Sequence, residues 1–296
     1  MMSMPDFTRR RLLGALALSA IARPAFAIDK PMRIASLSWA RAQILASIGA
    51  PPIALAERDS YPQVGALPPM PVGVIDLGSH SEPNLELLSQ LKPDLIVLDE
   101  DQARLTLELQ RIAPTLAINI YDPQLGKPYA LAIAETERIA ARINRMPQAR
   151  TYLNDVDAQL AAQARTIAML DVPPVLIVDL YDDGRHLFVY GPNSMIDDVM
   201  TRLGVTNAWR RATDMGYVLL GIEDLASLGH VQMFYISHGP RDRIALDNLA
   251  RSVLWRSMPF VSAGRFRALP GFFTYGASSC ATQFADGLTQ GLKAHG

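Results

Sequence analysis

The residues of this chain best suited to chemistry are aromatic side chains placed beside turns. Phe273 and Tyr275 follow a Pro-Gly turn, Tyr217 follows a glycine, and Tyr61 lies in a proline-containing loop. Aromatic rings on loops at sheet edges commonly line clefts that hold a small ligand with an apolar face. Taken alone, each of these residues is also explained as a core side chain. Together they indicate ligand binding.

The sequence lacks the short motifs that mark common catalytic sites. It contains no G-x-S-x-G, H-E-x-x-H, Walker or G-x-G-x-x-G pattern, so no enzyme activity is expected. The single Cys280 cannot form an internal disulfide, and one cysteine with scattered histidines offers no zinc framework. We therefore expect no intrinsic cofactor. A formal net charge of −1 gives no reason to expect a nucleic-acid partner.

The N-terminal residues have the three parts of an export signal. Positive Arg9–Arg11 precede the apolar run Leu12–Ala22, and Ala25-Phe26-Ala27 supplies the small-x-small pattern of a cleavage site. The apolar run is about half the roughly 20 residues needed to cross a bilayer. The alternative, a buried N-terminal helix, leaves the order of the three parts unexplained. We expect a signal peptide at residues 1–27, a twin-arginine route because of the arginine pair, and a periplasmic mature chain.

The remaining sequence alternates between strand-like and helix-like segments. This alternation predicts an α/β fold with mostly parallel sheets covered by helices on both faces. The expected strands are Arg33–Ser38, Ile53–Ala56, Leu95–Leu98, Leu116–Ile120, Val175–Leu180, Leu187–Tyr190 and Met233–Ser237. The expected helices are Ala40–Ile48, Asn84–Leu91, Leu105–Ile112, Ile196–Leu203 and Leu246–Trp255.

A short internal repeat suggests that the fold has two similar lobes. Glu86–Leu91 and Glu223–Leu228 both read Glu-x-Leu-x-x-Leu, and each is followed by a break and then a strand. Between the two copies, apolar residues at helical spacing predict one long helix over residues 147–170, starting at Pro147. We therefore expect an N-terminal lobe over residues 28–146, the connecting helix over 147–170, and a C-terminal lobe over 171–296.

Several segments together resemble one family along nearly the whole chain. The sequence is similar to periplasmic ferric hydroxamate siderophore-binding proteins of the ferrichrome-binding type. The matching segments are Gly78–Leu88, Phe188–Ser194, Asn207–Trp209, Pro259–Phe266 and Tyr275–Ala277. This resemblance implies two α/β lobes joined by a single long helix, as in the siderophore- and cobalamin-type solute-binding fold. It also implies a monomer that carries an Fe(III)-siderophore to an inner-membrane ABC permease and its ATPase, the iron arriving as a chelate.

The resemblance also assigns roles to particular residues. Glu86 and Glu223 match the two glutamates, one per lobe, that dock on permease arginines in the family. His80 occupies the position of an arginine that contacts the iron-chelating oxygens. Leu98 and Gln102 stand where the family's best-known members have aromatic residues. The expected ligand-binding residues are His80, Tyr61, Leu98, Gln102, Phe188, Asp214, Tyr217, Phe273 and Tyr275.

The sequence departs from the ferrichrome-binding pattern in its charge. An acidic run at Asp99–Asp101 adjoins the expected pocket, which favours a neutral or cationic chelate over an anionic one. Three alternatives stay open at this point. One is a haem or cobalamin-type receptor of the same fold, in which His80 would be an axial haem ligand. The others are a metallocluster enzyme built on paired lobes and a receptor for free metal.

Overall fold

The structure is a computed structural model that describes residues 31–294. The chain from Met32 onward forms one compact unit. The expected signal peptide at residues 1–27, with Arg9 and Arg10, lies outside the described residues. Within the described range, no helix is long and apolar enough to cross a membrane.

The N-terminal lobe is built on a five-stranded parallel sheet with the order β3-β2-β1-β4-β5. Its buried strands are rich in aliphatic residues, as expected for a parallel sheet covered on both faces. Helix α1 covers one face, and helices α2 and α3 cover the other. The elements are β1 (Ile34–Ser36), α1 (Trp39–Ser47), β2 (Ala54–Leu55), η1 (Tyr61–Val64), β3 (Ile75–Asp76), α2 (Leu85–Leu91), β4 (Leu95–Asp99), η2 (Glu100–Leu105), α3 (Thr106–Leu109) and β5 (Thr115–Ile118).

The C-terminal lobe holds a second five-stranded sheet, with the order β10-β9-β6-β7-β8. Strands β6, β9 and β10 are parallel, whereas β7 runs antiparallel to both β6 and β8. A tight turn at Asp183-Gly184 joins β6 to β7, and such a short connection can link only antiparallel strands. The elements are β6 (Val175–Leu180), β7 (His186–Tyr190), α6 (Met195–Arg202), β8 (Tyr217–Gly221), η3 (Ile222–Leu225), β9 (Gln232–Ile236), η4 (Gly239–Arg241), α7 (Asp242–Arg251), α8 (Val253–Ser257), α9 (Pro259–Ser262) and β10 (Phe266–Leu269).

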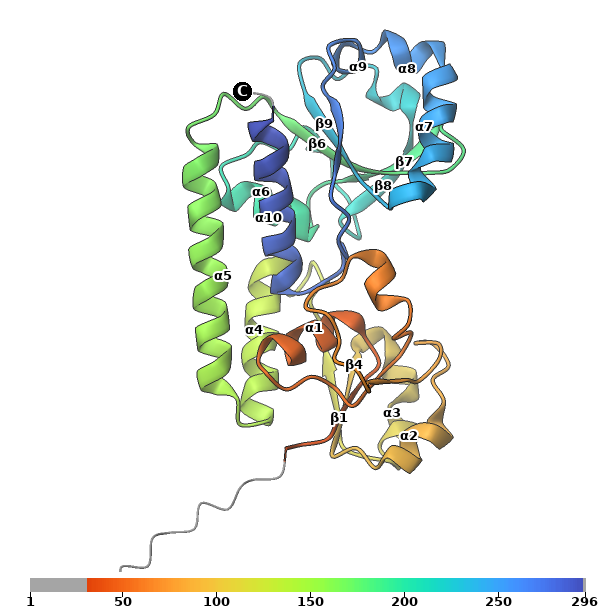
Figure 1. The fold of residues 1–296 in the computed structure, drawn as a ribbon, viewed down its shortest axis with the longest axis vertical. Helices are drawn as coiled ribbons and strands as arrows, with labels where there is room; N and C mark the ends of the chain where they lie inside the picture. The colour runs from red at the N-terminus through yellow and green to blue at the C-terminus, as the bar shows by residue number, and fades with distance from the viewer. Residues whose placement is uncertain (1–30, 295–296) are drawn as a thin grey trace, which may run out of the picture. The chain divides into compact units, whose positions relative to one another are not determined.

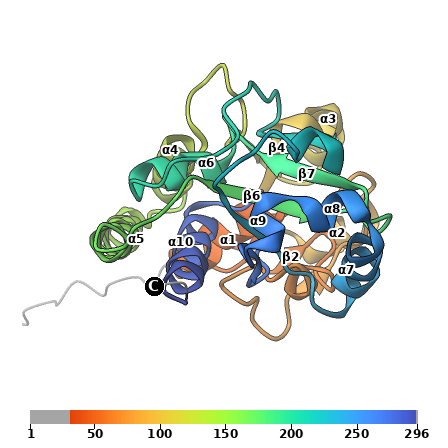
Figure 2. The same ribbon diagram turned by 90° about the horizontal axis from the view of Figure 1, so that it is seen from above.

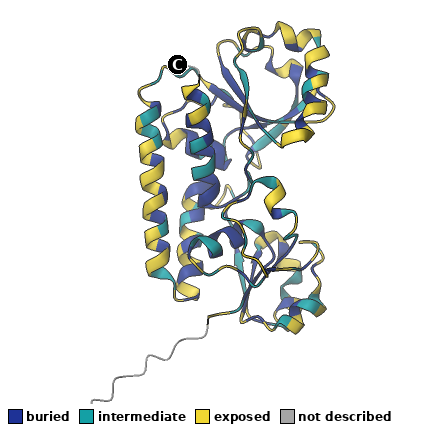
Figure 3. Cartoon of the chain, viewed as in Figure 1, coloured by how far each residue is buried: buried dark blue, intermediate teal, exposed yellow. Residues whose placement is uncertain are grey.

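Three longer helices lie along one side of both sheets (Figures 1 and 2). Helix α5 (Met146–Ile167) is the longest, and it packs against α4 (Pro128–Arg142) and α10 (Ser278–Lys293). Its apolar stripe, which includes Val156 and Leu160, is buried, while its opposite face is exposed (Figure 3). The expected long helix is present, although it ends at Ile167, three residues before the expected end.

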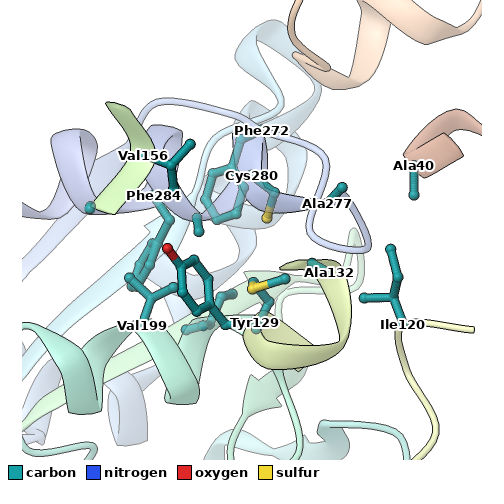
Figure 4. Packing of buried hydrophobic residues seen from close by; sticks show 14 of the residues in the cluster. Ala40, Ile120, Tyr129, Ala132, Val156, Val199, Phe272, Ala277, Cys280 and Phe284 are labelled. Atoms are coloured by element: carbon teal, nitrogen blue, oxygen red, sulfur yellow. The ribbon is translucent and has the colours of Figure 1, made fainter. Parts of the chain in front are cut away.

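The apolar side chains of these helices and of both sheets form one continuous core. Phe284 of α10 packs at 5.7 Å from the ring of Phe272, beside Val156 of α5 and Tyr129 of α4 (Figure 4). Cys280 lies in the same core, and burial raises the pKa of its thiol to about 12. The same cluster includes strand residues of both sheets, so the two lobes share a core.

The sequence misplaced several elements. The helix expected over Leu246–Trp255 is broken at Ser252, because the Ser252 hydroxyl accepts a hydrogen bond from the Trp255 N–H and begins a new helix. The second copy of the repeat, at Glu223, forms a 3-10 turn, whereas Glu86 lies in a true α-helix. Helices α4 and α10 and strands β3, β8 and β10 were not expected at all.

The core position of α10 predicts a large effect of truncating one of its leucines. Leu288 is 0% exposed, so Leu288→Ala should lower the free energy of unfolding by about 2–5 kcal/mol through lost burial and a new cavity. Leu107 is 76% exposed, so the matched change Leu107→Ala should alter it by less than about 0.5 kcal/mol. Urea unfolding of the two variants measures both values, and equal losses would contradict the packing of α10.

Candidate functional site

A cavity of about 460 Å³ opens where the N-terminal sheet ends and the loop after β10 passes. It adjoins the carboxyl ends of β4 and β5, the edge where open parallel sheets generally bind ligands. The N-terminal lobe contributes all the charged side chains and some apolar and aromatic ones, and the C-terminal lobe contributes only uncharged side chains. The lining residues are Ser38, Arg41, Asp99, Glu100, Asp101, Ile118, Asn119, Ile120, Tyr121, Asp122, Pro123, Met215, Phe273 and Tyr275.

A buried ion pair forms the base of the cavity. Arg41 of α1 has only 5% of its side chain exposed, and its guanidinium lies 2.6 Å from a carboxylate oxygen of Asp99. The same guanidinium also donates to the Ile118 carbonyl oxygen. Burial raises the pKa of Asp99 above its usual range, while the charge of Arg41 opposes that rise. The pair fixes the end of β4 against α1 and leaves little of the Arg41 charge for a ligand.

Three further carboxylates line the cavity without a cationic partner. Among the described residues, Glu100, Asp101 and Asp122 make no ion pair within 4.0 Å. The amide of Asn119 lies between two of them, donating to Glu100 at 2.5 Å and to Asp122 at 3.5 Å. The N-terminal side of the cavity is therefore acidic, and we call Glu100, Asp101 and Asp122 the acidic wall.

Aromatic rings form a chain that runs from Tyr121 of the N-terminal lobe into the C-terminal lobe. Tyr275 packs edge-to-face against Tyr121 at 5.0 Å and against Tyr217 at 6.3 Å, and Tyr217 packs on Phe188 at 5.2 Å. The Tyr121 hydroxyl donates to the Gly276 carbonyl at 2.6 Å, which joins the segment after β5 to the loop after β10. Burial raises the pKa of the Tyr275 hydroxyl above its usual range.

The structure brings some of the expected ligand-binding residues to this cavity. Phe273 and Tyr275 line it directly. Tyr217 and Phe188 stand behind Tyr275 in the aromatic chain. Asp214 is exposed beside Met215, whose carbonyl accepts a hydrogen bond from the Tyr275 hydroxyl at 3.2 Å.

The other expected residues do not line the cavity. Tyr61 is 1% exposed and packs at 6.2 Å from the ring of Trp39, which in turn contacts Phe273 at 5.2 Å. Leu98 is fully buried in the core of the N-terminal lobe. Gln102 is buried too, and its amide donates to the Leu37 and His80 carbonyls. These three residues support the walls of the site from behind.

His80 lies on an exposed loop next to the cavity. Its Nδ1 is 3.0 Å from a carboxylate oxygen of Glu57. The Gln102 amide holds the His80 backbone at 2.8 Å. No described histidine lines the cavity itself.

The two glutamates expected to dock on a permease lie outside the cavity. Glu86 is in the first turn of α2, near the backbone N–H groups of the helix start. Glu223 is in the η3 turn, where its carboxylate is 2.8 Å from the Arg185 guanidinium. The hydrogen bond from Arg185 lowers the pKa of Glu223. Both carboxylates therefore belong to turns on the surface of their lobes.

Sequence reasoning missed several lining residues. Tyr121 and Asp122 follow an expected strand directly, and polar or aromatic residues at the carboxyl end of a parallel strand are a usable signal for a site. Arg41 gave no such signal, because it lies within a helix and only the packing of α1 against β4 brings it to the cavity.

Comparisons with known proteins agree with this arrangement. The profile of a family described as "Periplasmic binding protein" matches residues 34–271. The iron(3+)-hydroxamate-binding protein FhuD of Escherichia coli K12 is 34% identical over 291 residues, covering 96% of each chain. The crystal structure of the siderophore-binding protein FhuD from Vibrio cholerae with Fe3+-Desferal bound has a TM-score of 0.80 at 27% identity, covering 90% of this chain and 99% of its own. These matches confirm the resemblance seen in the sequence.

A more distant structure supports the fold alone. The petrobactin-binding protein YclQ from Bacillus subtilis has a TM-score of 0.69 at 17% identity, covering 89% of this chain and 93% of its own. The expected α/β class with two mostly parallel sheets is thereby confirmed.

The buried ion pair predicts a large difference between two neighbouring carboxylates. Asp99→Asn leaves the Arg41 guanidinium buried without its counter-charge, which should lower the free energy of unfolding by about 3 kcal/mol. Asp101→Asn, at an exposed carboxylate with no ion pair, should change it by less than about 0.5 kcal/mol. Urea unfolding at neutral pH compares the two. A mild effect of Asp99→Asn would mean that Arg41 does not depend on that carboxylate.

Proposed function

Because the chain belongs to the periplasmic binding protein family, we propose that it captures an Fe(III)-siderophore of the hydroxamate type and delivers it to an inner-membrane ABC permease. The observation that carries this proposal is the full-length relationship to the hydroxamate-binding protein of Escherichia coli, at 34% identity. In this role the protein is a carrier and not an enzyme, and the iron belongs to the cargo.

The cavity supports the proposal chemically. A ferric hydroxamate presents an organic frame with apolar faces around a polar core of iron-bound oxygens. Phe273 and Tyr275 offer ring surface for the frame, while Ser38, Asn119 and Arg41 place polar groups at the base. His80, on its exposed loop next to the cavity, extends this polar side and is our candidate for a further contact to the chelate oxygens.

The surface glutamates support delivery to a permease. Glu86 and Glu223 are on different lobes and both lie outside the cavity, so a partner that contacts both would recognise the two lobes together. Arginines of a permease could replace the Arg185 partner of Glu223 during docking. We further propose export through the twin-arginine signal at Arg9-Arg10, so that the mature monomer works in the periplasm.

Ligand binding is tested by titration of the tryptophan fluorescence of the mature protein with ferric siderophores. A ferric trihydroxamate should quench the signal saturably, because Trp39 packs on the pocket residue Phe273. His80→Ala should weaken binding about three- to tenfold, as expected for one lost hydrogen bond of roughly 0.5–1.5 kcal/mol. His230→Ala, the same change at an exposed histidine that does not line the cavity, is the control. Haem binding with a Soret band, and no response to any hydroxamate, would contradict the proposal.

Docking is tested separately by charge reversal. Glu86→Arg and Glu223→Arg should each abolish siderophore-dependent growth, because they present a cation to the permease arginines. Affinity for the chelate in vitro should stay within about twofold, since neither residue lines the cavity. Glu137→Arg, an exposed reversal on α4, controls for a general change of charge. Normal growth of both docking variants would remove the two glutamates from the interface.

A further inference from the structure

The lining of the cavity has an excess of negative charge on one side. Among the described residues that line the cavity, Arg41 is the only Lys, Arg or His. The carboxylate of Asp99, 2.6 Å away, already neutralises its charge. The three carboxylates of the acidic wall remain without counter-ions among the described residues. Two basic side chains on neighbouring loops bond other groups and do not line the cavity: the Arg104 guanidinium donates to the Ser81 carbonyl, and the His80 ring faces Glu57.

The opposite side of the cavity is uncharged. Met215, Phe273 and Tyr275 form it, and a tyrosine hydroxyl, with an ordinary pKa of about 10, is neutral at pH 7. A ligand in the cavity therefore meets an apolar surface on one side and a negative field on the other. A cleft with charge of one sign on a low-dielectric surround concentrates ligands of the opposite sign.

A second feature indicates what the base of the cavity accepts. Only 5% of the Arg41 side chain is exposed. Its Nε is buried and has no hydrogen-bond partner among the described residues. Buried donors in proteins are almost always satisfied, so an orphaned one beside a cavity points to an acceptor supplied from outside the chain. Oxygens of a chelate, directly or through a water, are acceptors of that kind.

The charge of a ferric siderophore depends on its chelating groups and on its tail. Three hydroxamates carry three negative charges, which balance the three positive charges of Fe(III), so a trihydroxamate core is neutral. Three catecholates leave a core of net charge minus three. A free amino group on a trihydroxamate is protonated at neutral pH and makes the whole chelate cationic.

From these observations we infer that the acidic wall selects ferric chelates by charge. The preferred ligand is a trihydroxamate that carries a free ammonium group, with its oxygens toward the base at Arg41 and the ammonium toward Glu100, Asp101 and Asp122. Neutral trihydroxamates bind more weakly, and anionic catecholate chelates are excluded. This inference rests on the proposed function. It adds the charge of the chelate and the residues that recognise that charge.

The test compares two ligands that differ in one charge. The ferric complex of desferrioxamine B has a free ammonium group, and its N-acetyl derivative has the same hydroxamate core with a neutral end. For the wild-type protein at about 10 mM salt, we expect the cationic complex to bind about tenfold more tightly. The advantage should shrink toward unity at about 1 M salt, where the Debye length is about 3 Å.

Substitutions in the acidic wall test whether its carboxylates cause the preference for the cationic complex. In the triple variant Glu100→Gln, Asp101→Asn, Asp122→Asn, the ratio of the two dissociation constants should fall to about one, because the amides keep the hydrogen-bonding shape without the charge. Glu108→Gln, an exposed change on α3 that does not line the cavity, should keep the wild-type ratio. Circular dichroism checks that each variant is folded.

The outcomes separate this inference from the proposed function. Binding of both complexes with equal affinity by the wild-type protein at low salt overturns the charge selection and leaves the siderophore role intact. A tenfold preference that persists in the triple variant also overturns it, because the charge is then read elsewhere. Failure of the wild-type protein to bind either complex overturns both the proposed function and the inference.

Discussion

The apolar core shared by the two sheets is the constraint on which the rest of the structure depends. Ile34 and Val97 of the first sheet belong to the same buried cluster as Ile177 and Phe234 of the second, and α5 contributes residues along its length. Burial of apolar surface is the main favourable term in folding, so opening the lobes widely would expose part of this cluster. We therefore expect a site that is largely formed before the ligand arrives.

Polar contacts at the loop after β10 complete this constraint. The Ala277 N–H donates to the Gln43 side chain at 3.0 Å, and the Tyr121 hydroxyl donates to the Gly276 carbonyl. Near the same loop, a Cβ at Gly65 would lie 2.5 Å from the Gly271 carbonyl oxygen, and its φ of +66° also favours glycine. Side chains and backbone of the N-terminal lobe thus fix the loop that carries Phe273 and Tyr275, which places these two rings at the cavity that the acidic wall also lines.

The alternation of strands and helices was predictable from the sequence because each parallel strand is short, apolar and bounded by turns. Strand β4 and helix α2, with its Asn84 cap, lie where the pattern placed them. Helix α10 was missed because Gly287 and Gly291 interrupt a helical pattern that packing nevertheless stabilises. Glycine costs roughly 1 kcal/mol in a helix, yet a Cβ at Gly291 would lie 2.9 Å from the Phe234 ring, so packing favours glycine there.

The candidate site was predictable only where its residues follow strands or turns. Phe273 and Tyr275 satisfy that rule, whereas Arg41 is a helical residue whose place depends on tertiary packing. Gln102 illustrates the limit of the resemblance. It was expected to contact the ligand because it stands at an aromatic position of the family, but it is buried and its amide bonds the Leu37 and His80 carbonyls and the Asp99 N–H. Those bonds hold the turn that presents Glu100 and Asp101. Gln102, which was expected to bind the ligand, instead positions two carboxylates of the acidic wall through the hydrogen bonds of its neutral amide.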